Sequence, residues 1–223
     1  MNKVIVIIPA LNEEKTIGSV VKEAKKHSSE VLVINDGSID NTAQIAQEQG
    51  AIVYSHIINR GVGGALKTGF EAALLNQADI IVMLDADGQH DPSIIPNLIQ
   101  PLLENSADAV LGSRLLNPGQ MPFLRRLYNQ TANLVTFVLF GVKTTDSQSG
   151  LRAFNRKTLE LLELKANGPE ICSEIIKEIG RKKLRLKEIP IEAIYTEYSM
   201  SKGQNMYLGI KTFIKLIFLR AFR

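Results

Sequence analysis

Short apolar, β-branched segments alternate with helix-like segments along the first half of the chain, and this alternation limits the possible folds most strongly. The first apolar run, residues 4–8, is uninterrupted, as expected for a strand buried on both faces of a parallel sheet. Further strands are predicted at residues 30–35, 51–55, 79–84 and 107–111, with helices at 13–27, 41–49, 64–76 and 92–105. This alternation predicts an α/β fold with a doubly wound, mostly parallel sheet flanked by helices.

The alternation stops after residue 112. We predict a loop at residues 115–122, a helix at 123–140, a strand at 150–154, a helix opened by Gly168-Pro169-Glu170, a strand at 184–191 and a last amphipathic helix at 204–223. A chain of 223 residues that is 45% hydrophobic can bury one sizeable core and is short for two domains. We therefore predict one domain over residues 1–203, followed by a separate helix over residues 204–223.

Polar residues follow three of the predicted strands. They are Asn12-Glu13-Glu14 after the first strand, Asp36-Gly37-Ser38 after the second and Asp85-Ala86-Asp87 after the fourth. In doubly wound sheets, ligands bind outside the carboxyl ends of the strands. The three segments together predict a binding site at that edge.

Two of these segments carry specific chemistry. Asp85 and Asp87 are separated by one residue, and hard oxygen ligands at a strand end suit Mg²⁺ or Mn²⁺ bridging a diphosphate. The alternative is that both carboxylates only cap a turn, with Asp91 capping the helix that follows. Asp36 can accept a hydrogen bond from a base or ribose, whereas Asp40 is predicted to be an N-cap.

Charge and cysteine content narrow the partners. Residues 1–176 carry 15 Lys and Arg against 19 Asp and Glu, whereas residues 177–223 carry 11 against 4, so the carboxyl-terminal part predicts an anionic partner. Cys172 is the only cysteine, which excludes an intramolecular disulfide and a cysteine-cluster metal site.

The chain carries two candidate membrane-surface segments. The longest apolar stretches, residues 134–142 and 210–222, are shorter than the ~20 residues of a spanning helix, so we expect no membrane crossing. Residues 204–223 combine an apolar face with four cations and no acid, which predicts a helix lying in an anionic membrane surface. The alternative is packing on this domain or on a second subunit. Residues 123–140 are the second candidate, with an ordinary core helix as the alternative.

The motifs together resemble the inverting glycosyltransferases of family 2, which have the GT-A fold and use a nucleotide sugar. The matching segments are IPALNEE (8–14), NDGSIDNT (35–42), NRGVGGALKTG (59–69), DADGQH (85–90) and GSR (112–114). The second half is similar to the dolichyl- or polyprenyl-phosphate mannose or glucose synthases. The segments that carry this similarity are FLRRLYNQTAN (123–133), DSQSGLRAF (146–154) and YTEYSMSKGQN (195–205).

The resemblance implies a metal-dependent enzyme that moves a hexose, mannose or glucose, from a GDP- or UDP-sugar to a polyprenyl (dolichyl) phosphate. It implies a peripheral location at the cytoplasmic face of the cell membrane, Mg²⁺ or Mn²⁺ as cofactor, and no nucleic-acid partner. The implied nucleotide-sugar residues are Pro9, Asn12, Glu14, Asp36, Asp85 and Lys202, the metal residues Asp85, Asp87 and Gln89, and the acceptor-phosphate residues Arg114, Arg125 and Asn129. Asp87, Arg114 and Arg125 would be catalytic, with Arg126 as the register alternative to Arg125.

Parts of the sequence are also compatible with other functions. A sugar or protein hydroxyl acceptor would need a general base, for which Asp146 is the first candidate. A membrane-bound protein that holds nucleotide sugar without turnover would not require the metal residues. Gly61-Val62-Gly63-Gly64-Ala65 mimics a dinucleotide-binding loop, but the first strand ends in acids that would repel a diphosphate. A nucleotidyltransferase is disfavoured because the first loop lacks a glycine-rich, basic signature. His27, His56 and His90 are too scattered for a metal triad, and we expect the first two at the surface or in packing.

Overall fold

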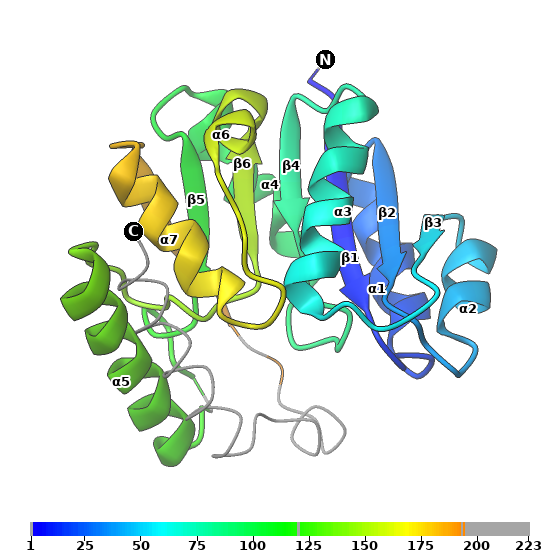
Figure 1. Cartoon of the computed structure of the whole chain (residues 1–223), viewed down its shortest axis with the longest axis horizontal. Helices are drawn as coiled ribbons and strands as arrows, with labels where there is room; N and C mark the ends of the chain where they lie inside the picture. Colours follow the sequence, from blue (N-terminus) through cyan, green and yellow to red (C-terminus); the bar gives the residue numbers. More distant parts are fainter. Residues whose placement is uncertain (1, 120, 193, 195–223) are drawn as a thin grey trace.

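A seven-stranded sheet runs through the centre of the molecule (Figure 1). The computed structural model describes residues 2–119, 121–192 and 194. Within them the strands lie in the order β3-β2-β1-β4-β6-β5-β7. Their bounds are β1 Val4–Ala10, β2 Glu30–Asn35, β3 Ile52–Ser55, β4 Ile80–Met83, β5 Ala109–Ser113, β6 Arg152–Asn155 and β7 Leu186–Pro190.

The sheet is parallel except at β6, which pairs antiparallel with both β4 and β5. The predicted doubly wound, mostly parallel sheet is confirmed. Strands β2, β1 and β4 are neighbours and run in the same direction, so their carboxyl ends lie side by side. These are the three strands whose following residues predicted a site.

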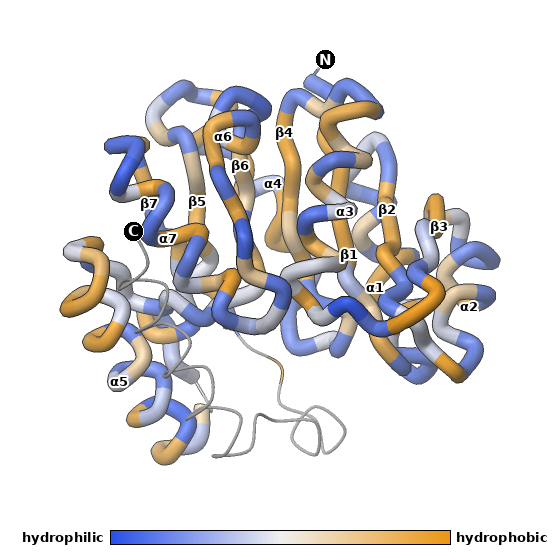
Figure 2. The backbone as a smooth tube through the Cα atoms, viewed as in Figure 1, coloured by the Kyte–Doolittle hydropathy of each residue, from blue (hydrophilic) through white to orange (hydrophobic). Residues whose placement is uncertain are grey.

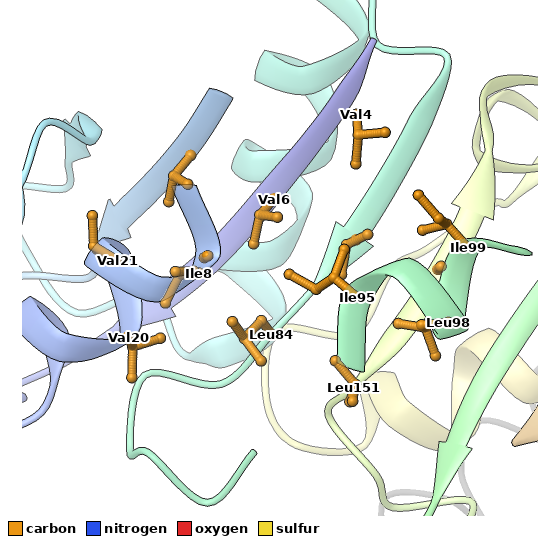
Figure 3. Close-up of a cluster of buried hydrophobic side chains, with 14 of the residues drawn as sticks. Val4, Val6, Ile8, Val20, Val21, Leu84, Ile95, Leu98, Ile99 and Leu151 are labelled. Carbon is orange, nitrogen blue, oxygen red and sulfur yellow. The ribbon is translucent and has the colours of Figure 1, made fainter. Parts of the chain in front are cut away.

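Helices cover both faces of the sheet. They are α1 Ile17–Ala24, α2 Thr42–Glu48, α3 Val62–Leu75, α4 Ile95–Leu103, α5 Phe123–Phe140, α6 Arg156–Leu161 and α7 Ile171–Arg181, with single 3₁₀ turns at Lys25–His27 and Pro92–Ile94. Alternate residues of β1 point to opposite faces. Val4, Val6 and Ile8 pack with α1 and α4 in one core (Figure 3), whereas Ile5 and Ile7 pack with α3 and α7 in the other.

Several element bounds differ from the prediction. The first helix begins at Ile17 instead of residue 13, because the segment before it is bonded to the loop after β2 and Asn12 has a left-handed backbone, with φ of 54°. Strand β5 lies two residues further along than expected, and its register is set by pairing with β7. Helix α6 was not predicted, although Asn155 caps it by accepting a hydrogen bond from the Thr158 N–H.

Helix α5 has the predicted bounds, and hydrophobic and hydrophilic residues occur together along it (Figure 2). Its buried residues are polar, whereas its large apolar side chains are exposed. Its two buried residues are Asn129 and Thr136. Its large exposed side chains are Phe123, Leu124, Leu127, Tyr128, Leu134, Phe137 and Val138. The alternative of an ordinary core helix at this position is therefore wrong. Figure 1 shows α5 standing outside the two helical layers, where it packs against α7.

Lys202 and the amphipathic helix predicted at residues 204–223 lie outside the described residues, so the predicted boundary at residue 203 stays a prediction. Among the helices of the described ranges, none has the length and apolar character needed to cross a membrane.

Candidate active site

The loops after β1 and β2 are tied together by their own polar side chains. The Asn12 N–H donates to the Ser38 hydroxyl over 2.9 Å, and the Asn12 side-chain oxygen accepts from the Ile39 N–H over 3.0 Å. The Glu14 carboxylate accepts from the Asn41 N–H over 3.3 Å. Asn12 and Glu14 thus shape the loop pair at which a nucleoside contact was predicted.

Asp36 is the best-held residue of this loop pair. It is buried, and its Oδ1 accepts from the Arg60 N–H over 2.9 Å and lies 2.7 Å from Nδ1 of His56. Because a carboxylate only accepts, His56 donates through Nδ1. The other ring nitrogen lies 3.0 Å from the Thr68 hydroxyl.

His56 was expected at the surface or in packing, and it is a hydrogen-bonding partner of a predicted site residue instead. It follows β3, the neighbour of β2, so the strand order brings it to the same edge as Asp36. Pro9 lies in β1 itself, beside Ile34 of β2.

Asp85 and Asp87 follow β4 at the neighbouring position on this edge. A Cβ atom added to Gly150 would collide with the Asp85 carboxylate, so the absence of a side chain at residue 150 makes room for Asp85. Burial and the charge of Asp87 raise the pKa of Asp85 to about 7, although Arg114 and Arg152 act in the opposite direction. Burial also raises the pKa of Asp87. Holding both groups ionised is therefore costly without a cation.

The donor set fits a divalent cation that also binds phosphate. Mg²⁺ is usually held by one or two carboxylates, with substrate phosphates and water completing its shell. Asp85 and Asp87 can supply these two carboxylates. Within residues 2–119, 121–192 and 194 there is no group of three or more His, Cys, Asp or Glu side chains that could hold a metal ion without such a phosphate. Gln89 is buried beside them, and its backbone N–H donates to Asp87 Oδ1 over 2.9 Å.

His90 is a further residue at Asp85 that the sequence reasoning did not place there. Its Nε2 lies 3.7 Å from Oδ2 of Asp85, and its side chain is buried. Burial, together with the charge of Arg114, lowers the pKa of His90 to about 3, so the ring is neutral at pH 7. The signal in the sequence was its place in the segment DADGQH.

Arg114 at the end of β5 forms a buried ion pair with Asp146. Its Nε and Nη2 donate to the two carboxylate oxygens over 2.7 and 2.8 Å, and its backbone N–H donates to Oδ2 over 3.0 Å. The side chain of Asp146 is 0% exposed. Asp146 is therefore the counter-ion of Arg114 and is not accessible to a sugar hydroxyl, which argues against its predicted role as a general base.

Arg125 and Asn129 lie on α5. Arg125 is half-buried, and its charge opposes the effect of burial on the pKa of Asp87, whereas Arg126 is exposed. Asn129 is buried, with its amide nitrogen 3.9 Å from the Met121 sulfur. Of the two register alternatives, Arg125 is the half-buried one, and its charge lowers the pKa of Asp87.

Arg152 is a buried cation that sequence reasoning missed. Its guanidinium donates to the carbonyl oxygens of Ser147, Ser149 and Cys172 over 2.8 to 3.0 Å. These bonds fix the segment that carries Asp146 and Gly150. The signal was an arginine inside the strand predicted at residues 150–154, because an arginine that becomes buried needs partners for its donors.

The glycines at the start of α3 serve packing. The N–H groups of Gly63 and Gly64 donate to the Asn167 carbonyl over 2.8 and 3.2 Å. A Cβ added to Gly61 or Gly63 would strike the backbone at Asn167 or Ala166. The helix N-terminus is therefore occupied by a backbone carbonyl, and the dinucleotide-binding alternative is wrong.

Two proteins with similar sequences are named as glycosyltransferases whose names include a polyprenyl phosphate. The chain is 41% identical over 237 residues to UDP-N-acetylglucosamine--dolichyl-phosphate N-acetylglucosaminyltransferase of Methanococcus voltae, covering 96% of this chain and 94% of the relative. It is 31% identical over 220 residues to undecaprenyl-phosphate mannosyltransferase of Micrococcus luteus, covering 93% and 90%.

The fold is that of a solved GT-A enzyme. Glucosyl-3-phosphoglycerate synthase from Mycobacterium tuberculosis, in complex with Mn²⁺, UDP and phosphoglyceric acid, superposes with a TM-score of 0.76. That match has 21% sequence identity and covers 98% of this chain and 78% of the synthase. The sequence model of glycosyl transferase family 2 matches residues 5–162. The doubly wound sheet, the carboxylates after β4 and these similarities agree, and the chain belongs to glycosyl transferase family 2.

Proposed function

We propose that this glycosyltransferase moves a hexose-type sugar from a nucleotide diphosphate sugar to a polyprenyl phosphate, with inversion, at the cytoplasmic face of a membrane. Hexose-type includes mannose, glucose and N-acetylglucosamine, because the two relatives are named for mannosyl and N-acetylglucosaminyl transfer. The donor would bind at Asp36, Asp85 and Asp87.

The observation that supports a lipid acceptor is the orientation of α5, whose polar side chains are buried and whose large apolar side chains are exposed. The helix presents Phe123 and Leu124 to solvent, with 76% and 77% exposure, and it also bears Arg125. A polyprenyl phosphate has the same division, with an apolar chain on one side and a phosphate on the other. The charge of Arg125 acts on Asp87, so a lipid phosphate bound at Arg125 would lie on the side of α5 that is near Asp87. The polyprenyl chain would follow the exposed apolar side chains of the helix.

An acceptor that is already an anion needs no general base, which agrees with the burial of the Asp146 carboxylate. One oxygen of the anionic lipid phosphate attacks the anomeric carbon, and the bond from that carbon to the donor diphosphate oxygen breaks. The electron pair leaves with the nucleoside diphosphate, and no proton has to be removed. The protein orients two phosphates and stabilises the leaving charge.

A cation at Asp85 and Asp87 would supply charge neutralisation for the leaving diphosphate. The residues of this chain do the rest. His56 and the Arg60 N–H hold Asp36 in place for the nucleoside. Asp146 accepts from Nε and Nη2 of Arg114 and so fixes the plane of the guanidinium, and the edge formed by Nη1 and Nη2 is the one that would meet a phosphate.

The proposal is tested with the full chain, membrane lipids, Mn²⁺ and labelled UDP-glucose, UDP-N-acetylglucosamine and GDP-mannose. We expect label from one donor to enter the organic phase as a product that mild acid releases, because a glycosyl phosphate is acid-labile. Transfer only to water-soluble sugars or peptides would instead support the hydroxyl-acceptor alternative. Donor binding without any transfer would support a binding protein.

We also expect α5 to contribute to membrane binding. Replacing Phe123 and Leu124 together by serine should lower partitioning onto anionic liposomes at least about tenfold, since each large apolar side chain contributes ~1.5–3 kcal/mol when fully buried. Liposome flotation measures the effect. The control is Leu75→Ser on α3, which removes a leucine that is 83% exposed and should leave flotation unchanged.

Two outcomes would contradict this membrane role. Equal flotation of the double variant and the unchanged protein would show that α5 does not meet the lipid. A change from dimer to monomer in the double variant, with flotation unchanged, would identify the apolar face of α5 as a subunit interface.

A further inference from the structure

The buried polar face of α5 meets the loop over residues 144–149, which carries the counter-ion of Arg114. Asn129, Asn133 and Thr136 share this face, being four and three residues apart along the helix. The side-chain amide of Asn133 donates to the Thr145 carbonyl, and its oxygen accepts from the Ser147 N–H over 2.8 Å. Asn133 thus binds the two backbone groups on either side of Asp146.

This bracket is coupled directly to Arg114. Asp146 sits between the two bonded backbone groups, so Asn133 helps to fix the backbone position from which the carboxylate extends to Arg114. That carboxylate receives three hydrogen bonds from Arg114. The neighbouring Thr145 hydroxyl lies 2.6 Å from the Ser113 hydroxyl, at the end of β5.

Arg125, by contrast, is part of α5 itself. Asn133 therefore links the helix that bears Arg125 to the backbone beside Asp146, and Asp146 in turn binds the guanidinium of Arg114. We propose that Asn133 is a positioning residue that fixes Arg114 relative to Arg125, so that both guanidinium groups can meet one acceptor phosphate. This inference rests on the proposed acceptor role of the two arginines, whereas the hydrogen bonds of Asn133 do not depend on it.

The test compares Asn133→Leu with Thr136→Val in the full-length protein. Leucine has a similar volume and can make neither bond. Thr136 is a matched control because it is buried on the same face and bonds the same loop, through the Ser147 hydroxyl at 3.3 Å, without touching the backbone beside Asp146. We expect Asn133→Leu to raise the acceptor KM about tenfold, with the donor KM within about twofold, and Thr136→Val to change neither.

A double-mutant cycle separates positioning from general destabilisation. If Asn133 acts through Arg114, the effects of Asn133→Leu and Arg114→Lys on the acceptor KM should be non-additive, because the second change removes what the first disturbs. Fully additive effects, or equal changes in the donor and acceptor KM, would overturn the positioning role and leave a purely structural one.

A second readout does not require any acceptor. The backbone N–H of Arg114 is bonded to Asp146, so hydrogen exchange at Arg114 reports whether the pair is held. We expect faster exchange at Arg114 and Ser147 in Asn133→Leu, and unchanged exchange at Arg114 in Thr136→Val. Unchanged exchange at Arg114 in Asn133→Leu would overturn the inference. A wild-type protein that uses another acceptor would overturn the proposed function and leave this exchange measurement decisive.

Discussion

Replacing Asp87 by asparagine is expected to reduce sugar transfer more than about 100-fold and to abolish the metal dependence of donor binding. The carboxylate lies at the end of β4 beside Asp85, and burial raises the pKa of both groups. Without a bound cation, the negative charge of Asp87 therefore destabilises the folded state. A metal-free Asp87→Asn protein should unfold at the same temperature as the unchanged protein or at a higher one. Initial rates, donor titration calorimetry with and without Mn²⁺, and thermal unfolding measure these three quantities.

Asp91→Asn is the matched control for this experiment. Asp91 lies in the same segment, but its carboxylate accepts from the N–H and the hydroxyl of Ser93 and so caps a 3₁₀ turn. Asparagine is an equally good cap, and transfer should remain unchanged. Full activity of Asp87→Asn, or of the unchanged enzyme in excess EDTA, would show that Asp87 does not hold a cation needed for the reaction.

The sheet could be predicted because strands buried on both faces leave continuous apolar runs in the sequence. Strand β2 has its predicted bounds for this reason. Helix α5 has its predicted bounds because Pro122 marks a clear start. The antiparallel direction of β6 could not be predicted, since a strand of four residues does not specify its neighbours. The choice is made by tertiary pairing with β4 and β5.

The site divides in the same way. Asp36 and Asp85 could be placed at one edge because β2 and β4 both run parallel to β1, which lies between them, so the carboxyl ends of all three strands share that edge. His56, Asn133 and Arg152 were missed because their partners lie elsewhere in the chain and include backbone groups, which leave no signal in residue type. The orientation of α5 was also open, since amphipathicity gives two faces without saying which one is buried.

The pairing of Arg114 with Asp146 changes what a substitution at Arg114 is expected to do. Arg114→Ala would leave a carboxylate that is 0% exposed without its cation, and breaking such a buried pair costs ~3–5 kcal/mol of the free energy of unfolding. Urea unfolding measures this loss. A kinetic defect in Arg114→Ala would therefore combine damage to the loop with any loss of acceptor binding.

A double variant separates the two effects. Arg114→Met together with Asp146→Asn removes both charges of this buried pair, and the asparagine oxygen can still accept from the backbone N–H of residue 114, so most of the lost stability should return. Transfer should not return, because no guanidinium is present for the acceptor phosphate. We expect a kcat/KM for the acceptor at least about tenfold below that of the unchanged enzyme, with the donor KM preserved. If the double variant regained full transfer along with its stability, Arg114 would be a structural partner of Asp146 alone, and the acceptor phosphate would have to be held by Arg125 and other residues of α5.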